Sequence, residues 1–526
     1  MEPRSWQWKV WRRRYDPKIK AQGELESLMR HSVSYDEWFE HALAHDQCSG
    51  ALAWRQREAT RLYDHGSIRR RLKRLQALRR GGDNRRLLFA LNEGIHGNMA
   101  GMGRPALYQQ ALTGTKQLVT DYIEAICSAL KYLSSSAAND IPPGERLHFF
   151  HRASHCYGRS ALMLSGGGTL GYFHLGVLKV LIEQHLCPRV ISGASAGAFV
   201  AAIVGTRTDS EFLDLFEGHQ LAKDLTANPN GIKLGLFRRE KPDMSAIAED
   251  MARFIPDMTF MEAYEKTGRA INITISPAEP QQTSRLLNYI ASPNVTLRSA
   301  VLASSALPGV FPAVQLKARN DKGQVEPYLP MRRWIDGSLS QDLPAKRLAR
   351  LYGVNHFIVS QVMPGLGRER SAQPGLQKTL SDASVAAAKQ MLRGAFDVVQ
   401  RRQAVPAQLG TAMNIINGLI DQRFSGDITI CPNYGFSALN KALSMLDHDQ
   451  MVSLFQAGER ATWPKIPMIE STTRIGRELD TILGEWSTRE EQWLNTALPD
   501  VAGKKTPAKQ SRKSPKTRKD TRHATR

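Results

Sequence analysis

Between residues 158 and 365, short apolar runs rich in β-branched residues alternate with helical stretches. The apolar runs predict strands at residues 161–164, 190–192, 271–276 and 357–362. The stretches between them predict helices at residues 175–183 and 196–204. Continuously apolar strands separated by helices are typical of a mostly parallel sheet that is covered on both faces. The alternation therefore predicts an α/β fold for this region.

A helical pattern precedes the α/β region. Ile68, Leu72, Leu75 and Leu78 recur at helical spacing, and seven Lys and Arg residues occupy the other face of the same helix. A basic amphipathic helix of this kind binds a membrane surface, a nucleic acid or a partner protein, or its basic side is simply a solvated face of a helical domain. The sequence leaves these alternatives open. A further long helix is predicted over Gln110–Leu133.

Shifts in composition and clusters of Gly, Pro and Ser divide the chain into five segments. They are a basic, Trp-rich segment (1–17), a helical domain (18–155), the α/β domain (156–365), a mainly helical region that completes this domain or forms a lid (366–490), and a disordered basic tail (491–526). Helices are predicted at 384–404 and 438–446, with one strand at 427–431. The last 24 residues (503–526) carry about nine of the 21 net positive charges and lack the apolar residues of a core.

Several classes of protein are disfavoured by composition. The five cysteines are scattered, without a CxxC pair, which argues against a disulfide framework and a structural zinc site and favours a reducing compartment. No apolar run approaches the roughly 20 residues that span a bilayer, and the N-terminus does not resemble a secretory signal. We expect a cytoplasmic protein that associates with membranes or lipid only peripherally, with no cofactor and no metal.

A glycine-rich loop follows the first predicted strand. In SGGGTLGYFHLGV, Gly166, Gly168 and Gly171 fit the pattern GxGxxG, which also describes a dinucleotide-binding loop. A dinucleotide site needs an acidic residue about 20 positions further on, at the end of the second strand. This chain has none there, so the loop calls for another explanation.

The second predicted strand leads into Gly193-Ala194-Ser195-Ala196-Gly197, a GxSxG sequence that opens a helix. Small residues on both sides of a serine permit the sharp turn that exposes a nucleophilic hydroxyl at a helix N-terminus. The glycine loop about 25 residues upstream then has a chemical purpose, because the N–H groups of Gly167 and Gly168 are suited to an oxyanion. The two motifs together predict a serine nucleophile with an oxyanion hole.

A serine hydroxyl needs a base. The downstream histidines His219, His356, His448 and His523 do not lie in loops that follow predicted strands, whereas Asp336 leaves the apolar run at Trp334-Ile335 and precedes Gly337. We therefore predict that Asp336 is the base. His174, in the helix after the glycine loop, is predicted to be a hydrogen-bonded core histidine, with a role behind the oxyanion loop or as a third catalytic member as the alternatives.

The motifs GGGTLG, GASAG and DGS, in this order and with the connecting segment Ser304–Pro312, resemble the patatin-like phospholipase family. The segments Ser34–Trp38 and Gly114–Lys116 are similar to the helical domain that precedes the patatin domain in triacylglycerol lipases of lipid stores. The resemblance implies a three-layer domain, a Ser195–Asp336 dyad without histidine, and an oxyanion hole formed by the loop Gly166, Gly167, Gly168, Thr169, Leu170 and Gly171.

Two positions depart from the broad family. Ser338 stands where the family usually has Gly or Ala, and Leu170 stands where it often has Arg. Both match the triacylglycerol-lipase-like branch better, so substrate class is less firmly implied than chemistry.

The resemblance implies a hydrolase that cleaves fatty-acyl esters of glycerolipids, with triacylglycerol favoured. A phospholipase A or lysophospholipase, and a noncatalytic membrane-binding scaffold, are the alternatives. The expected partner is lipid at a membrane or lipid-droplet surface, and an anionic membrane suits the positive charge. Nucleic acid is disfavoured because no reader motif accompanies that charge. The oligomeric state is left open.

Overall fold

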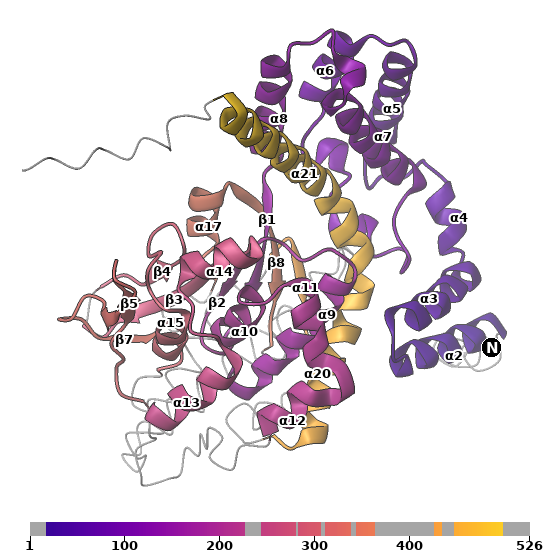
Figure 1. Ribbon diagram of the computed structural model, residues 1–526. Coiled ribbons are helices and arrows are strands. Elements are labelled where there is room, and N and C mark those ends of the chain that lie inside the picture. Colours follow the sequence, from indigo (N-terminus) through magenta and orange to yellow (C-terminus); the bar gives the residue numbers. More distant parts are fainter. Residues whose placement is uncertain are drawn as a thin grey trace, which may run out of the picture.

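The structure is a computed structural model, and it describes residues 17–226, 244–279, 282–306, 311–337, 343–362, 426–433 and 446–497. A helical N-terminal region, an α/β region and a pair of C-terminal helices follow one another along the chain (Figure 1).

The N-terminal region is helical, as predicted. Its helices are α2 (Pro17–His31), α3 (Tyr35–Ser49), α4 (Ala51–Gln56), α5 (His65–Arg80), α6 (Asn84–Asn92), α7 (Gln117–Ser134) and α8 (Pro143–Tyr157). Helices α5 to α8 share one apolar core, whereas Met29, Trp38 and Ala42 of α2 and α3 belong to the core of the α/β region.

Helix α7 begins seven residues later than the start predicted at Gln110. The backbone N–H groups of Leu112 and Thr113 and the Thr113 hydroxyl all donate to the buried carboxylate of Asp46 in α3. These donors are therefore used by a long-range contact instead of a helix. The sequence showed an apolar pattern there, but it did not show this partner.

The sheet confirms the predicted α/β fold with mostly parallel strands. Its members are β1 (Arg159–Leu164), β2 (Val190–Gly193), β3 (Ala270–Pro277), β4 (Arg285–Leu287), β7 (Trp334–Asp336), β8 (Val354–Ser360) and β9 (Ile428–Ile430). The strand order is β4-β3-β2-β1-β8-β9, with β7 also paired to β3. The β2–β3, β1–β2, β1–β8 and β8–β9 pairs are parallel, whereas β4 and β7 run antiparallel to β3. A separate hairpin joins β5 (Lys317–Arg319) and β6 (Val325–Pro327).

Alternate residues of each strand enter different cores. Leu162 and Leu164 of β1 join the cluster that includes α9 and α10, whereas Ala161 and Met163 join a second cluster with Leu348 of α17. The helices around the sheet are α9 (Phe173–Glu183), α10 (Ala196–Gly205), α11 (Asp209–Leu213), α12 (Gln220–Thr226), α13 (Met244–Phe254), α14 (Phe260–Thr267), α15 (Leu297–Ser304) and α17 (Ala345–Tyr352). Both faces of the sheet are therefore covered, as the continuously apolar strands require.

Two C-terminal helices, α20 (His448–Thr462) and α21 (Ile466–Ala497), return to the earlier parts of the chain. Helix α20 packs along α9, and α21 runs on from it to α7 and α8 (Figure 1). Ile475, Leu479 and Ile482 of α21 complete the core of the N-terminal bundle. Because α21 continues to Ala497, the start of the predicted tail at residue 491 is wrong by seven residues. The segment 1–16, the helix predicted at 384–404 and most of the one at 438–446 lie outside the described residues.

Helices α9 and α20 cross at two glycines. A Cβ added to Gly176 would lie 1.9 Å from the carbonyl oxygen of Phe455, and one added to Gly458 would lie 2.2 Å from that of Phe173. The two backbones therefore touch, and no side chain fits between them. This crossing fixes α20 against the helix that follows the glycine loop.

Gly176→Ala should lower the free energy of unfolding by about 1–3 kcal/mol, because the added methyl group must displace the α20 backbone. Gly484→Ala in α21 is the matched control, since an added Cβ there has no neighbour within 4 Å. The control should be neutral or stabilising, because alanine is the better helix former. Chemical denaturation measures both effects. Equal stability of the two variants would contradict the close crossing.

Candidate active site

Ser195 occupies a strained turn between β2 and α10. Its φ is 52° and its ψ is −121°, a conformation that non-glycine residues rarely adopt and that costs about 1–3 kcal/mol. A Cβ added to Gly193 would lie 2.2 Å from the carbonyl oxygen of Gly197, and one added to Gly197 would lie 2.3 Å from that of Leu164. Ala194 is fully buried, whereas Ser195 and Ala196 are half-buried. The turn has the geometry expected of a nucleophile elbow, and it leaves the serine accessible.

The buried hydroxyl of Ser304, at the end of α15, holds this turn. Its Oγ accepts a hydrogen bond from the Ser195 N–H at 3.0 Å and donates to the Thr274 carbonyl oxygen of β3 at 2.8 Å. The serine turn is therefore tied to the next strand as well as to its own. In the sequence, Ser304 stands out only as part of the connecting segment Ser304–Pro312. Its position after an apolar helix was visible, but its partners were not.

Asp336 lies far from Ser195 in the chain, but strand β7 places it on the same strand, β3, that holds the Ser195 turn. Strand β4 pairs with one edge of β3. Strand β2 pairs with the other edge as far as Ile273, which lies opposite Gly193 of β2. Ile275 pairs with both Arg285 of β4 and Asp336 of β7, so β7 takes over the edge that β2 leaves. Measured along β3, Asp336 thus lies two residues beyond the end of β2, the strand that leads into the Ser195 turn.

The segment that directly follows α15 also holds the Asp336 turn. The N–H of Asp336 donates to the carbonyl oxygen of Ala306 at 3.0 Å, two residues after Ser304. Asp336 is fully buried, and an added Cβ at Gly337 would lie 2.4 Å from the Thr274 carbonyl oxygen. The two predicted dyad residues are therefore brought together by Thr274 and by the end of α15. Ser338, the residue that departs from the family pattern, lies outside the described residues.

The glycine loop lies against the start of α10. It follows β1 and forms a short 3-10 turn, η4 (Gly168–Tyr172), in which Gly168 has a φ of 59°. An added Cβ at Gly171 would lie 2.4 Å from the Cβ of Ala196. Gly166, Leu170 and Gly171 are buried, whereas Gly167, Gly168 and Thr169 are half-buried. The part of the loop predicted to stabilise an oxyanion is the part that remains open beside the serine turn.

His174 is fully buried beneath this loop. Its Nε2 lies 2.9 Å from the carbonyl oxygen of Ser165, and its Nδ1 lies 2.7 Å from the hydroxyl of Ser360 at the end of β8. A carbonyl oxygen only accepts, so Nε2 carries the proton and Nδ1 accepts from Ser360. Burial lowers the pKa of His174 to about 4 despite the opposing hydrogen bond to Ser165. The neutral ring connects the first residue of the glycine loop to the neighbouring strand.

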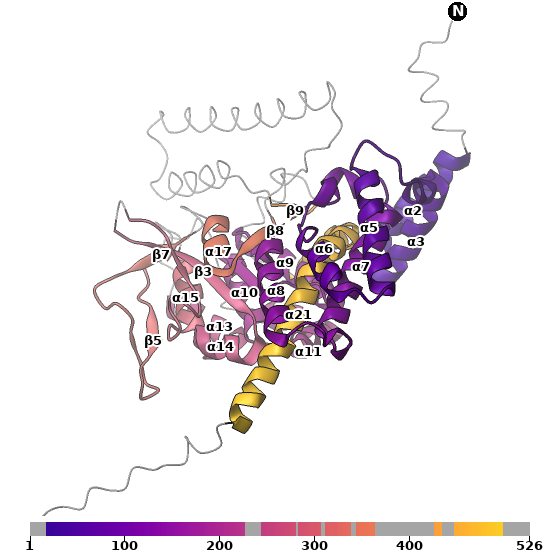
Figure 2. The same ribbon diagram turned by 90° about the horizontal axis from the view of Figure 1, so that it is seen from above.

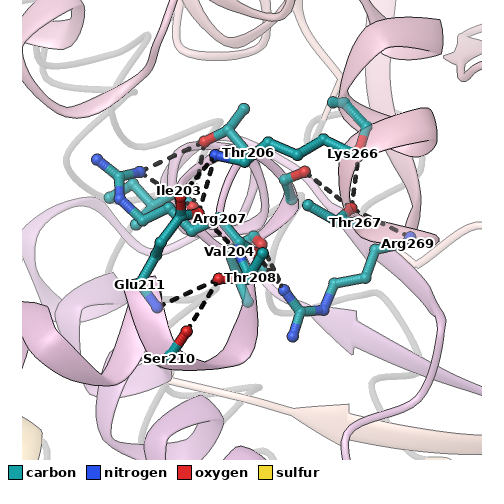
Figure 3. Close-up of polar contacts among 12 residues, drawn as sticks. Ile203, Val204, Thr206, Arg207, Thr208, Ser210, Glu211, Lys266, Thr267 and Arg269 are labelled. Atoms are coloured by element: carbon teal, nitrogen blue, oxygen red, sulfur yellow. Dashed lines mark hydrogen bonds and ion pairs between the residues drawn. The ribbon is translucent and has the colours of Figure 1, made fainter.

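The far end of α10 is clamped by Arg269, immediately before β3. Its guanidinium donates to the carbonyl oxygens of Val204 and Arg207 (Figure 3). It also pairs with the carboxylate of Asp209. The Thr267 hydroxyl donates to Gly205 in the same cluster. A cation at a helix C-terminus complements the helix dipole. The clamp therefore fixes the helix whose other end begins at the Ser195 turn.

Comparison with known proteins agrees with this arrangement. Residues 162–349 match the family described as patatin-like phospholipase, and residues 13–155 match a domain of unknown function, DUF3336. A patatin-like phospholipase domain-containing protein of Coccidioides immitis is 33% identical over 500 residues, which cover 90% of this chain and 67% of that protein.

This chain belongs to the patatin-like phospholipase family. The family match includes the glycine loop, the serine turn and Asp336. Two relatives carry an activity in their names. Triacylglycerol lipase SDP1L of Arabidopsis thaliana is 31% identical over 88% of this chain and 59% of its own length. Triacylglycerol lipase 4 of Saccharomyces cerevisiae is 32% identical over 85% of this chain and 51% of its own length. The chain thus spans little more than half the length of these relatives.

The described ranges bring together no group of three or more His, Cys, Asp or Glu side chains suited to a metal ion. They also contain no helix that combines the length and apolar character needed to cross a membrane.

The buried His174 gives this patatin-like domain a pH-dependent stability. The unfolded chain binds a proton near the ordinary pKa of 6.5, whereas the folded chain resists protonation until about pH 4. The contribution of the neutral ring is therefore complete above about pH 6.5 and is lost as the pH falls from there toward 4. His174→Gln should flatten the decline of the melting temperature across this window. His148→Gln, at an exposed position of α8, should leave the wild-type slope unchanged. Identical slopes in all three proteins would refute the assignment of a neutral buried ring.

Proposed function

We propose that this protein is a serine lipid acyl hydrolase in which Ser195 is the nucleophile and Asp336 is its base. The observation that carries the proposal is the convergence of the strained Ser195 turn and the buried Asp336 on one edge of β3, with the glycine loop beside them. This is the minimum that acyl transfer through a serine needs, namely a nucleophile, a proton acceptor and oxyanion donors.

The proposed reaction has two steps. Asp336 takes the hydroxyl proton of Ser195 as the serine oxygen attacks the ester carbonyl, and backbone N–H groups of Gly167 and Gly168 bind the oxyanion. Collapse of this intermediate transfers the proton to the departing alcohol and leaves an acyl-serine. Water, activated by the same carboxylate, then releases the fatty acid and restores the serine. His174 has a positioning role only, because both of its ring nitrogens already bind the scaffold.

Triacylglycerol is the proposed substrate. Two relatives similar over more than four fifths of this chain are named triacylglycerol lipases, one from a plant and one from a yeast. A phospholipase A or lysophospholipase is the second candidate, favoured by a net charge of about +12 outside residues 503–526. Both candidates use the same dyad, so the preferred substrate separates them.

Ser195→Ala and Asp336→Asn should each lower the release of fatty acid from triolein emulsion by about 1,000-fold or more, because each removes one half of the proposed dyad. Ser210→Ala and Asp321→Asn, at exposed positions away from the site, are the matched controls and should retain wild-type rates. Phosphatidylcholine vesicles, assayed in parallel, identify the preferred substrate. Wild-type protein that binds vesicles but hydrolyses neither lipid would favour the scaffold alternative.

We also propose that the segment leading into β7 contacts the lipid surface, and that the protein is a peripheral lipid-associated enzyme of the cytoplasm. Met331 is 94% exposed, Leu329 is also exposed, and Arg332 and Arg333 follow directly. Apolar side chains beside arginines suit the boundary between lipid and water. The β5–β6 hairpin and β7 lie at the side of the domain away from α2 and α3 (Figure 2). Asp336 is three residues beyond Arg333, so a lipid held by this segment is close to the dyad.

Met331→Gln should reduce hydrolysis of triolein emulsion several-fold while leaving hydrolysis of a soluble short-chain ester unchanged, because only the emulsion requires insertion into a lipid surface. Val33→Thr removes another exposed apolar side chain, far from β7, and should change neither rate. A parallel loss on both substrates would indicate damage to the site, and no loss on either would contradict the docking role.

A further inference from the structure

A pocket in the N-terminal helical bundle is lined by arginines. It has a volume of about 250 Å³, and its wall consists of Ser67, Arg70, Arg71, Arg74, Leu75, Ala90 and Tyr122. The first four are spaced at three and four residues along α5, so they project from one side of that helix. The apolar residues Ile68, Leu72 and Leu75 anchor α5 on the bundle. The arginine side is thereby held over α6 and α7, and the site is far along the chain from the dyad.

Arg71 is the most constrained of these cations. Its Nε is buried and has no hydrogen-bond partner within the described chain, and its Nη1 is 3.4 Å from the Glu93 carbonyl oxygen, at the limit of a hydrogen bond. Burial raises the pKa of the neighbouring Tyr122, whereas the charge of Arg71 and a hydrogen bond from it act to lower that pKa. The guanidinium therefore lies beside the Tyr122 hydroxyl. A buried N–H without an acceptor is costly, so the site favours a ligand that supplies one.

The charge of the pocket is poorly balanced by the protein. No acidic residue lines the wall, and Glu93 reaches only Arg74, at 3.0 Å in a half-exposed ion pair. Arg70 forms no ion pair within the described residues. Three guanidinium groups, compensated by one carboxylate at the rim, leave an excess of about two positive charges. The Ser67 and Tyr122 hydroxyls add two neutral donors to the same wall.

We propose that this pocket binds a phosphate monoester. Its dianion matches the excess charge, and its oxygens accept the forked hydrogen bonds that guanidinium groups donate. The volume accommodates one such group with a few attached atoms. An internal phosphodiester of a nucleic acid carries a single charge, so it matches the excess of about two positive charges less well. The phosphate is carried either by a lipid headgroup or by a small soluble molecule.

The first experiment uses the full chain and calorimetric titration with glycerol 3-phosphate, with glycerol as the uncharged reference. Wild-type protein should bind glycerol 3-phosphate and not glycerol. Arg70→Gln combined with Arg71→Gln should weaken binding about tenfold or more, because each lost guanidinium removes charge-assisted hydrogen bonds. Arg85→Gln combined with Arg86→Gln changes net charge equally on the exposed face of α6, outside the pocket, and should leave binding unchanged.

A second variant guards against loss of folding. Ser67→Asp places a carboxylate in the pocket wall but also in the first turn of α5, where a negative charge favours the helix. It should keep the wild-type melting temperature and still weaken binding. Absence of wild-type binding, an equal effect of the α6 control pair, or competition by an oligonucleotide without terminal phosphates would each overturn the proposal.

Vesicle sedimentation distinguishes the two sources of phosphate. Vesicles of phosphatidylcholine with phosphatidate are compared with vesicles of phosphatidylcholine with phosphatidylserine at equal surface charge. A preference for phosphatidate that disappears in the Arg70/Arg71 variant identifies a lipid headgroup. Binding of glycerol 3-phosphate without that preference identifies a soluble phosphate monoester. Both results support the pocket, and activity on triolein is not needed to read either one.

Discussion

The edge of β3 that faces β2 is the constraint on which the candidate site depends. Strand β2 occupies this edge up to Ile273, and β7 occupies it from Ile275 in the opposite direction. Ser195 leaves the sheet where β2 stops, and Asp336 is the last residue of β7. Two residues separated by 141 positions in the chain are therefore neighbours because two strands share one edge.

The strain at Ser195 is sustained by the groups around it. The Ser304 hydroxyl accepts a hydrogen bond from the Ser195 N–H and donates one to the carbonyl oxygen of Thr274, so the turn has a partner on β3. Helix α10 begins at this turn, and Arg269 clamps its other end. Backbone contacts at Gly193 and Gly197 leave no room for a side chain at either position. Strained residues persist only where surrounding structure determines them in this way, and such positions are often functional.

The helical parts of the chain are joined to the α/β domain more closely than a division into segments suggests. Helix α20 crosses α9 at a glycine contact, directly after the loop beside Ser195. Helix α21 then completes the core of α5 to α8, which holds the arginine-lined pocket. Packing thus connects the bundle to the catalytic domain through one continuous C-terminal element.

Much of this protein is determined by local sequence. The strand and helix alternation follows from apolar runs and their spacing, because burial on two faces requires continuous apolar strands. The glycine loop and the GASAG turn were recognisable because only small residues fit where backbones meet, and the resemblance to the patatin-like family followed from them. The pairing of Ser195 with Asp336 was a prediction from residue type and the family pattern. Tertiary structure alone decided how Ser304 and Ala306 hold both turns, why α7 starts at Gln117, and how Arg71 comes to lie beside Tyr122. These depend on contacts between residues far apart in the chain, and local pattern does not encode which distant donor meets which acceptor.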